Sequence, residues 1–209
     1  MIPVALTFDD GYLNHFYVAK MLKRRGIRAT FFVITHLKEF QGRQLLTVKP
    51  ELLKEMNLMG HEIGSHTCTH SILTNLSRDK LVLELKGSKE YLSELLHDEI
   101  IGFSYPGGFY NTHVILEVSK YYRYARLGGR RFESRSWNAK KGRKYSKYLI
   151  EGIGAKELLK LPLKYALYRD IKPVIIFHND PPWLIEIVVK YLESFGVKFI
   201  TLNELAELL

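Results

Sequence analysis

The chain has 209 residues, of which 46% are apolar and one is cysteine, and its formal net charge is +9. This length suits one large domain or two small ones, and the apolar share excludes a disordered, collagen-like or disulfide-stapled chain. The longest apolar runs are too short to span a bilayer and no basic region precedes the first, so we expect a cytoplasmic protein without a signal peptide or membrane span.

Short β-rich apolar runs alternate with longer helical patterns along the whole sequence. Strands are expected at residues 2–8, 29–34, 61–64, 100–103, 122–127, 174–177 and 197–200. Helices are expected at 13–25, 50–59, 77–96, 112–121, 155–168 and 182–195, with a kink or break at Pro162. Thr201 and Glu204 form a capping box that opens one more helix. Residues 128–153 are irregular and basic.

The alternation of strands and helices predicts an α/β fold with parallel strands and right-handed crossovers, as either an open sheet or a barrel. No linker or repeat divides the chain, so we expect one domain over residues 1–209. In both architectures ligands bind at the carboxyl ends of the strands. Polar groups follow four of the expected strands: Asp9 and Asp10, His66 and His70, Tyr105 with Pro106, and His178. They should face a common site.

Two of these clusters point to a metal. Adjacent carboxylates after a buried strand are costly unless a cation or hydrogen bonds compensate them, although Asp10-Gly11 is also a common turn dipeptide. The spacing of His66 and His70 predicts two imidazoles on one side of a helical turn. With Asp10 they supply one oxygen and two nitrogens, a set that suits Zn²⁺ or another divalent transition ion. Cys68 and His61 are expected to be structural.

The positive charge is concentrated between residues 120 and 147, a stretch that contains nine arginines and lysines and a single acid, Glu133. A solvated surface segment is the favoured interpretation, and attraction of an anionic substrate is the alternative. No nucleic-acid fingerprint accompanies the charges, so no nucleic-acid partner is expected.

Four motifs together resemble those of the polysaccharide deacetylase (NodB-homology) family, which is carbohydrate esterase family four. They are Thr7-Phe8-Asp9-Asp10-Gly11, the segment 60–70 ending in His66-Thr67-Cys68-Thr69-His70, Phe103-Ser104-Tyr105-Pro106-Gly107-Gly108, and Ile175-Ile176-Phe177-His178-Asn179-Asp180. Their order and spread match the family over nearly the whole chain. The resemblance implies a distorted (β/α) barrel of about seven parallel strands.

The resemblance also implies roles for the site residues. Asp9 would be the general base and His178 the general acid, while Asp10, His66 and His70 would hold the metal. The backbone N–H of Tyr105 would help to stabilise the oxyanion, with Pro106 beside it. Trp137 is an even choice between a substrate contact and a partly buried surface aromatic.

The sequence departs from the family pattern at two motifs. Ser104 stands where the third motif commonly has an arginine that orients the base, and Arg130 or Arg131 is a candidate replacement from another loop. The counterpart of the fourth motif, residues 134–137, carries no carboxylate.

The leading prediction is therefore a metal-dependent hydrolase that removes an N-acetyl or related N-acyl group from an amino sugar or glycan, an anionic one being an option. The cofactor would be Zn²⁺, with Co²⁺, Mn²⁺ and Ni²⁺ as alternatives. Two other readings stay open: a C–N hydrolase acting on a non-sugar amide, and a catalytically impaired carbohydrate-binding homologue. The glycan, the acyl group and the oligomeric state are not fixed by the sequence.

Overall fold

The structure, a computed structural model, describes residues 1–128, 146–158 and 174–209. Its main sheet has eight strands, and every pairing within that sheet is parallel. They are β1 (Pro3–Phe8), β2 (Thr30–Val33), β5 (Glu62–Ser65), β6 (Gly102–Ser104), β7 (Tyr124–Arg126), β8 (Ile153–Gly154), β9 (Val174–Phe177) and β10 (Lys198–Ile200). The predicted α/β class with parallel strands is confirmed.

The sheet curves into a distorted barrel in the order β7-β6-β5-β2-β1-β9-β8. The two ends of this path are joined through Ile150, whose N–H donates to the Ala125 carbonyl at 3.1 Å and whose carbonyl accepts from the Leu127 N–H at 2.9 Å. Three residues later β8 pairs with β9. β10 lies off the path and pairs with the first half of β1, which makes the barrel irregular.

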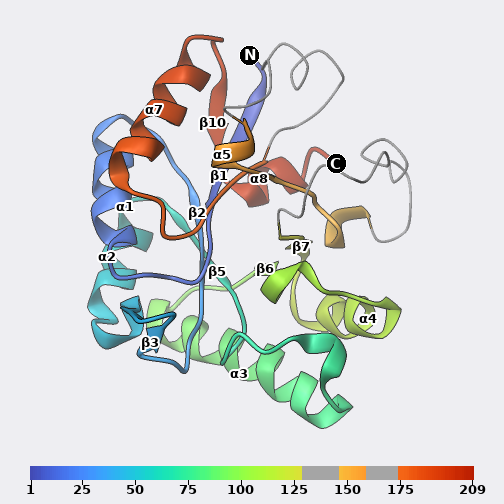
Figure 1. The fold of residues 1–209 in the computed structure, drawn as a ribbon. Helices are drawn as coiled ribbons and strands as arrows, with labels where there is room; N and C mark the ends of the chain where they lie inside the picture. Colours follow the sequence, from blue (N-terminus) through green and yellow to red (C-terminus); the bar gives the residue numbers. More distant parts are fainter. Residues whose placement is uncertain (129–145, 159–173) are drawn as a thin grey trace.

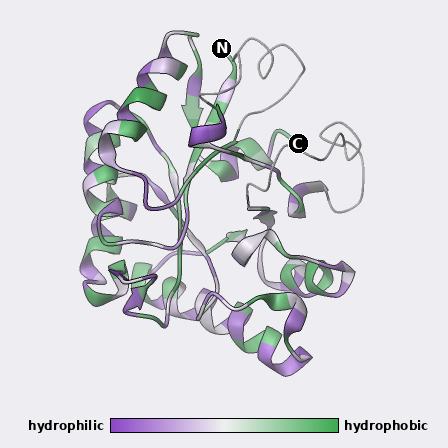
Figure 2. Ribbon diagram, in the orientation of Figure 1, coloured by the Kyte–Doolittle hydropathy of each residue, from purple (hydrophilic) through white to green (hydrophobic). Residues whose placement is uncertain are grey.

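Helices cover the outside of the strands (Figure 1). They are α1 (His15–Arg24), α2 (Glu51–Leu58), α3 (Arg78–Leu96), α4 (Thr112–Tyr121), α5 (Ala155–Leu158), α7 (Pro182–Glu193) and α8 (Leu202–Ala206). Their ribbons carry apolar and polar residues on different sides, as helices packed against a core do (Figure 2). The capping box of Thr201 and Glu204 is confirmed. The helix expected at 155–168 is described only to Leu158, and its remainder lies outside the described residues.

Sequence patterns did not predict a small antiparallel hairpin formed by β3 (Glu39–Phe40) and β4 (Arg43–Gln44). Four short 3₁₀ helices were also not expected: Leu46–Val48, Leu73–Asn75, Pro106–Gly108 and Ser146–Tyr148. No helix in the described part of the chain is both long enough and apolar enough to cross a bilayer.

A layer of aromatic rings supports the ends of the central strands. The Phe8 ring stacks between Phe31 and Phe177, with ring centroids 4.7 and 4.9 Å apart. All three side chains are fully buried. Because Phe8 and Phe177 directly precede Asp9 and His178, this packing fixes the backbone from which those polar residues project.

Candidate metal and catalytic site

Asp9 and Asp10 leave β1 in different directions. The Asp9 N–H donates to the Phe177 carbonyl at 2.9 Å, so it still belongs to the parallel ladder. Asp10 has φ +73° and Gly11 φ +74°, which turns the chain sharply. Both carboxylates are buried, and the turn lets each of them meet its own set of partners. The pair is therefore more than a surface turn.

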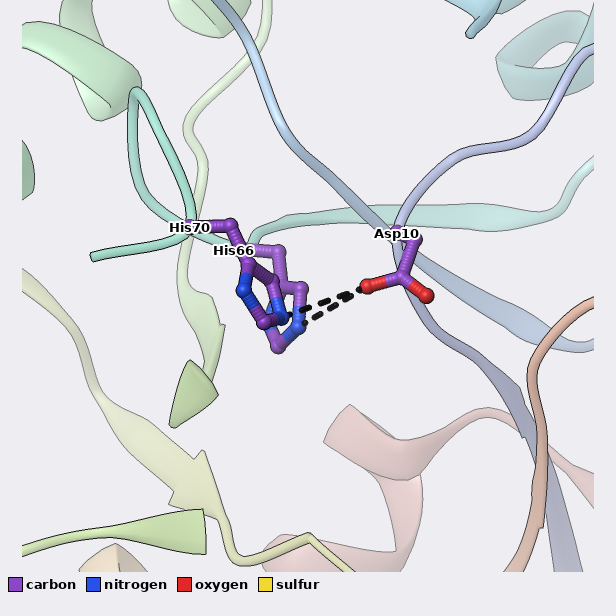
Figure 3. Close-up of side chains that lie close together, drawn as sticks. All are labelled: Asp10, His66 and His70. Atoms are coloured by element: carbon purple, nitrogen blue, oxygen red, sulfur yellow. Dashed lines mark ion pairs between the residues drawn. The ribbon is translucent and has the colours of Figure 1, made fainter. Parts of the chain in front are cut away.

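Asp10, His66 and His70 converge, although they come from two different strand ends (Figure 3). Asp10 Oδ1 lies 3.4 Å from His66 Nε2 and 3.5 Å from His70 Nε2, and the three candidate ligand atoms all lie within 4.8 Å of one another. Ligands about 2.0–2.1 Å from a tetrahedral ion are roughly 3.3 Å apart, so the spacing fits such an ion. Asp10 Oδ1 is buried and has no hydrogen-bond partner among the described residues, as expected of a ligand atom.

Hydrogen bonding, burial and nearby charges act differently on the two imidazoles. His66 Nδ1 donates to the Ser104 carbonyl at 2.8 Å, which directs its Nε2 toward Asp10. Burial and the neighbouring His66 lower the pKa of His70 to about 4, which keeps its imidazole in the neutral, ligating form. Burial disfavours a charged His66 as well, but Asp10 and Asp9 outweigh it and raise the pKa of His66. The position between these groups therefore attracts positive charge.

The segment 66–70 is not the helical turn that the spacing predicted. Thr67 and His70 have φ of +69° and +59°, so the chain forms an irregular loop. Glu84 of α3 holds this loop: its carboxylate accepts hydrogen bonds from the N–H groups of Cys68 at 2.8 Å and Thr69 at 3.0 Å. The convergence of His66 and His70 thus depends on the strand end and on Glu84, and not on helical geometry.

Asp9 belongs to a separate buried network centred on Arg126 of β7. The Arg126 guanidinium donates to Asp9 Oδ1, to Ser104 Oγ at 2.7 Å and to the Leu127 carbonyl at 2.8 Å. Arg126 is fully buried. Arg130 and Arg131, the candidate replacements for the third-motif arginine, lie outside the described residues. Within the described part of the chain, it is Arg126 whose guanidinium contacts Asp9.

The other oxygen of Asp9 faces His178, whose Nε2 lies 3.6 Å from Asp9 Oδ2. The His178 side chain is 57% exposed, so one side of the pair is open to a substrate. Buried His15 holds the backbone of His178, because His15 Nε2 donates to the His178 carbonyl at 2.7 Å. Burial by itself would raise the pKa of Asp9, but the charges of Arg126, His66 and His178 hold that pKa below its ordinary value. Asp9 is therefore ionised at neutral pH.

Of the three residues expected to contact the substrate or the oxyanion, the structure describes two, Tyr105 and Pro106. The Tyr105 N–H donates to the Arg126 carbonyl at 3.0 Å, so it is already paired and is not free to face an oxyanion. Pro106 is buried at the start of the 3₁₀ helix that follows β6. Trp137, the fourth-motif segment 134–137 and most of the basic stretch lie outside the described residues.

Comparisons with known proteins identify the family of this chain. Residues 2–125 match the sequence profile of the family described as Polysaccharide deacetylase. The protein YxkH of Bacillus subtilis, a putative polysaccharide deacetylase, is 35% identical over 118 residues, which are 56% of this chain and 41% of YxkH. A peptidoglycan-N-acetylglucosamine deacetylase of Bacillus cereus is 27% identical over 210 residues, 97% of this chain and 87% of that protein.

The fold matches as well. The crystal structure of the Xyl-CE4 domain of a multidomain xylanase from the hindgut metagenome of Trinervitermes trinervoides superposes with a TM-score of 0.71 at 21% identity, over 99% of this chain and 90% of that one. The chain belongs to the polysaccharide deacetylase family, and this family implies a divalent metal. The chain spans about half the length of several curated relatives that it matches.

Reasoning from the sequence missed Arg126, Glu84 and His15 as parts of the site. Arg126 had one signal, a charged residue inside an expected strand, which is costly unless it is paired. Glu84 and His15 lie on helices and had no signal in their spacing, because their partners are the backbone groups of distant loops.

Proposed function

We propose that this chain hydrolyses the N-acetyl group of an amino sugar, with Zn²⁺ held by Asp10, His66 and His70, Asp9 as general base and His178 as general acid. The observation that carries the proposal is the convergence of three ligand atoms within 4.8 Å of one another, next to a carboxylate that lies 3.6 Å from an exposed imidazole. Co²⁺, Mn²⁺ and Ni²⁺ suit the same one-oxygen, two-nitrogen set. Residues 1–209 would act as one catalytic domain.

A divalent ion bound at this position would lower the pKa of a coordinated water and polarise the acyl carbonyl. Asp9 accepts a proton from the attacking water through Oδ2, because Oδ1 is engaged by Arg126. As the C–N bond breaks, His178 donates a proton to the departing nitrogen, so that acetate and a free amine are formed. Its half-exposed side chain can reach a sugar without any movement of the buried network. The paired N–H of Tyr105 has no part in this scheme.

The substrate class rests on the relatives. The B. cereus relative is named for N-acetylglucosamine in peptidoglycan, and a matching B. subtilis protein, PdaA, for N-acetylmuramic acid. An N-acetylated amino sugar is the part common to both names. A non-sugar amide remains the competing substrate. An impaired binding protein is the less favoured alternative, because the Arg126 guanidinium contacts Asp9 although Ser104 stands in the third motif, and every residue proposed as base, ligand or acid is present.

The test is acetate release from N-acetylated chitooligosaccharides and from simple acetamides by protein loaded with one equivalent of Zn²⁺. Asp9→Asn should lower kcat by at least about 100-fold, the usual scale of a general base. Asp79→Asn, which removes an exposed acid from the start of α3, is the matched control and should behave as wild type. Turnover that survives both Asp9→Asn and chelation would refute the mechanism. Turnover confined to acetamides would refute the sugar substrate.

A further inference from the structure

The β3–β4 hairpin lies against the site, and one of its faces is turned toward it. Phe40 pairs directly with Arg43 across the two strands. Directly opposed residues of an antiparallel pair project from the same face. The hairpin is fixed to the segment that follows Asp10, since the Leu13 N–H donates to the Gln44 carbonyl at 2.9 Å.

The two side chains on this face reach opposite sides of the site. The Phe40 ring packs on the metal-ligand candidate His70, with centroids 4.4 Å apart. Arg43 reaches Asn179, the residue after His178. The side-chain amide of Asn179 lies against the Arg43 guanidinium. With its oxygen assigned to that side, it accepts from Arg43 Nε and, at 3.2 Å, from Nη1, and its nitrogen faces the Asn14 side chain 3.1 Å away. The hairpin face therefore extends from the candidate ligand His70 to the residue that follows the candidate proton donor.

Arg43 carries an uncompensated charge at this position. The side chain is exposed, and no carboxylate of the described ranges forms an ion pair with it. Asn179 is neutral and occupies only part of a guanidinium that has five N–H donors. The charge also reaches into the site: burial and Asp10 raise the pKa of Tyr12, and Arg43 acts on the same hydroxyl in the opposite direction.

We propose that Arg43, oriented by Asn179, forms a subsite for an anionic group of the substrate, a carboxylate or phosphate carried close to the N-acyl amino sugar. Carboxylate and phosphate both match the planar fork of arginine and accept paired hydrogen bonds from it. Because Asn179 directly follows His178, an anion held by Arg43 would lie near the backbone segment that carries the candidate proton donor. The subsite rests on the deacetylase function proposed above and narrows its substrate from amino sugars in general to acidic ones.

Matched substrates separate the charge from the rest of the sugar. One pair is a disaccharide that contains N-acetylmuramic acid and its neutral methyl ester; the other is N-acetylglucosamine 1-phosphate and N-acetylglucosamine. Zn²⁺-loaded wild type should show a higher kcat/KM for the anionic member of at least one pair. In Arg43→Gln this anionic-to-neutral ratio should fall by about tenfold, the scale of one exposed charge-assisted contact. Arg43→Lys should keep part of the preference.

Arg24→Gln is the control, because it removes the same charge from the exposed end of α1, which lies away from the carboxyl ends of the strands. Its ratios should equal those of wild type, which excludes general attraction of anions by the basic chain. Ratios near one in wild type, or ratios that Arg43→Gln leaves unchanged, would overturn the subsite while acetate release still supports the deacetylase. Absence of acetate from all four substrates would overturn the deacetylase and the subsite together.

Discussion

The buried contact between Arg126 and Asp9 gives the sharpest energetic prediction. Arg126→Met keeps most of the side-chain volume but removes the guanidinium from a carboxylate that is itself 2% exposed. Breaking a buried ion pair by removing one partner costs about 3–5 kcal/mol, because the remaining charge is uncompensated. We therefore expect the free energy of unfolding of the metal-free protein to fall by about this amount at pH 7.

The loss should depend on pH in a defined direction. In wild type the pKa of Asp9 is held below its ordinary value of 3.8, so the pair stabilises the fold above that value, and the stabilisation is lost as pH falls through the folded-state pKa. Without Arg126, the charges of His66 and His178 remain to oppose burial among the described residues, and the pKa of Asp9 moves upward. The stability difference between the two proteins should therefore be largest at neutral pH and shrink as pH falls through this raised pKa.

Urea unfolding followed by circular dichroism measures the effect, with a chelator present so that metal binding adds nothing. Arg123→Met is the control: this neighbouring arginine is 67% exposed and pairs with Glu99, and surface pairs contribute about 0–1 kcal/mol. Asp9→Asn combined with Arg126→Met removes both charges and should cost about 2–3 kcal/mol less than the sum of the single changes. Additive costs, or a loss below about 1 kcal/mol for Arg126→Met, would refute the pairing.

Two further predictions concern the residues that hold the loops of the site. Glu84→Gln replaces a carboxylate that accepts hydrogen bonds from the 66–70 loop with an amide that carries N–H donors. Zn²⁺ affinity, measured in competition with a chelating dye, should therefore weaken by about tenfold, while Glu90→Gln on the same helix leaves it unchanged. Equal affinities in the two variants would contradict the role of Glu84 in holding the loop. Burial lowers the pKa of His15 to about 4, so the unfolded chain takes up a proton first and the metal-free protein should lose about 2 kcal/mol of stability through this residue between pH 7 and pH 5. His15→Gln should lack that loss in unfolding titrations and His113→Gln should keep it; the same acid response in both variants would show that His15 is not the group responsible.

The site was predictable where it depends on the ends of strands. Buried apolar runs located β1 and β9, and a short strand was expected at residues 61–64, where β5 lies. The rule that ligands gather at the carboxyl ends of parallel strands predicted that Asp10 and His66, 56 positions apart in the sequence, lie close together. The predicted local geometry was wrong in the segment 66–70, where residues with positive φ determine the backbone path. Thr67 and His70 both have positive φ, which a pattern of spacing does not reveal. The prediction succeeded because β1 and β5 flank β2 in the sheet.

The hairpin at 39–44 escaped prediction for a different reason. Its strands have two residues each, too few for an alternating pattern to be visible. Its turn residues, Gln41 and Gly42, have φ of +49° and +73°, the positive values that a two-residue hairpin turn requires. A glycine in the second position was the only signal, and a single glycine also suits many other loops.

The arginine on β7 lies beside the residue that stands in place of the third-motif arginine. Ser104 and Arg126 are directly paired across β6 and β7, and in a parallel pair their side chains point to the same side of the sheet. A guanidinium from either position can therefore reach Asp9, provided that the other position is small enough to leave room. Ser104 meets this condition and also accepts a hydrogen bond from Arg126. A guanidinium thus lies beside Asp9 although Ser104 stands at the third motif, and a search within the motif alone could not find it.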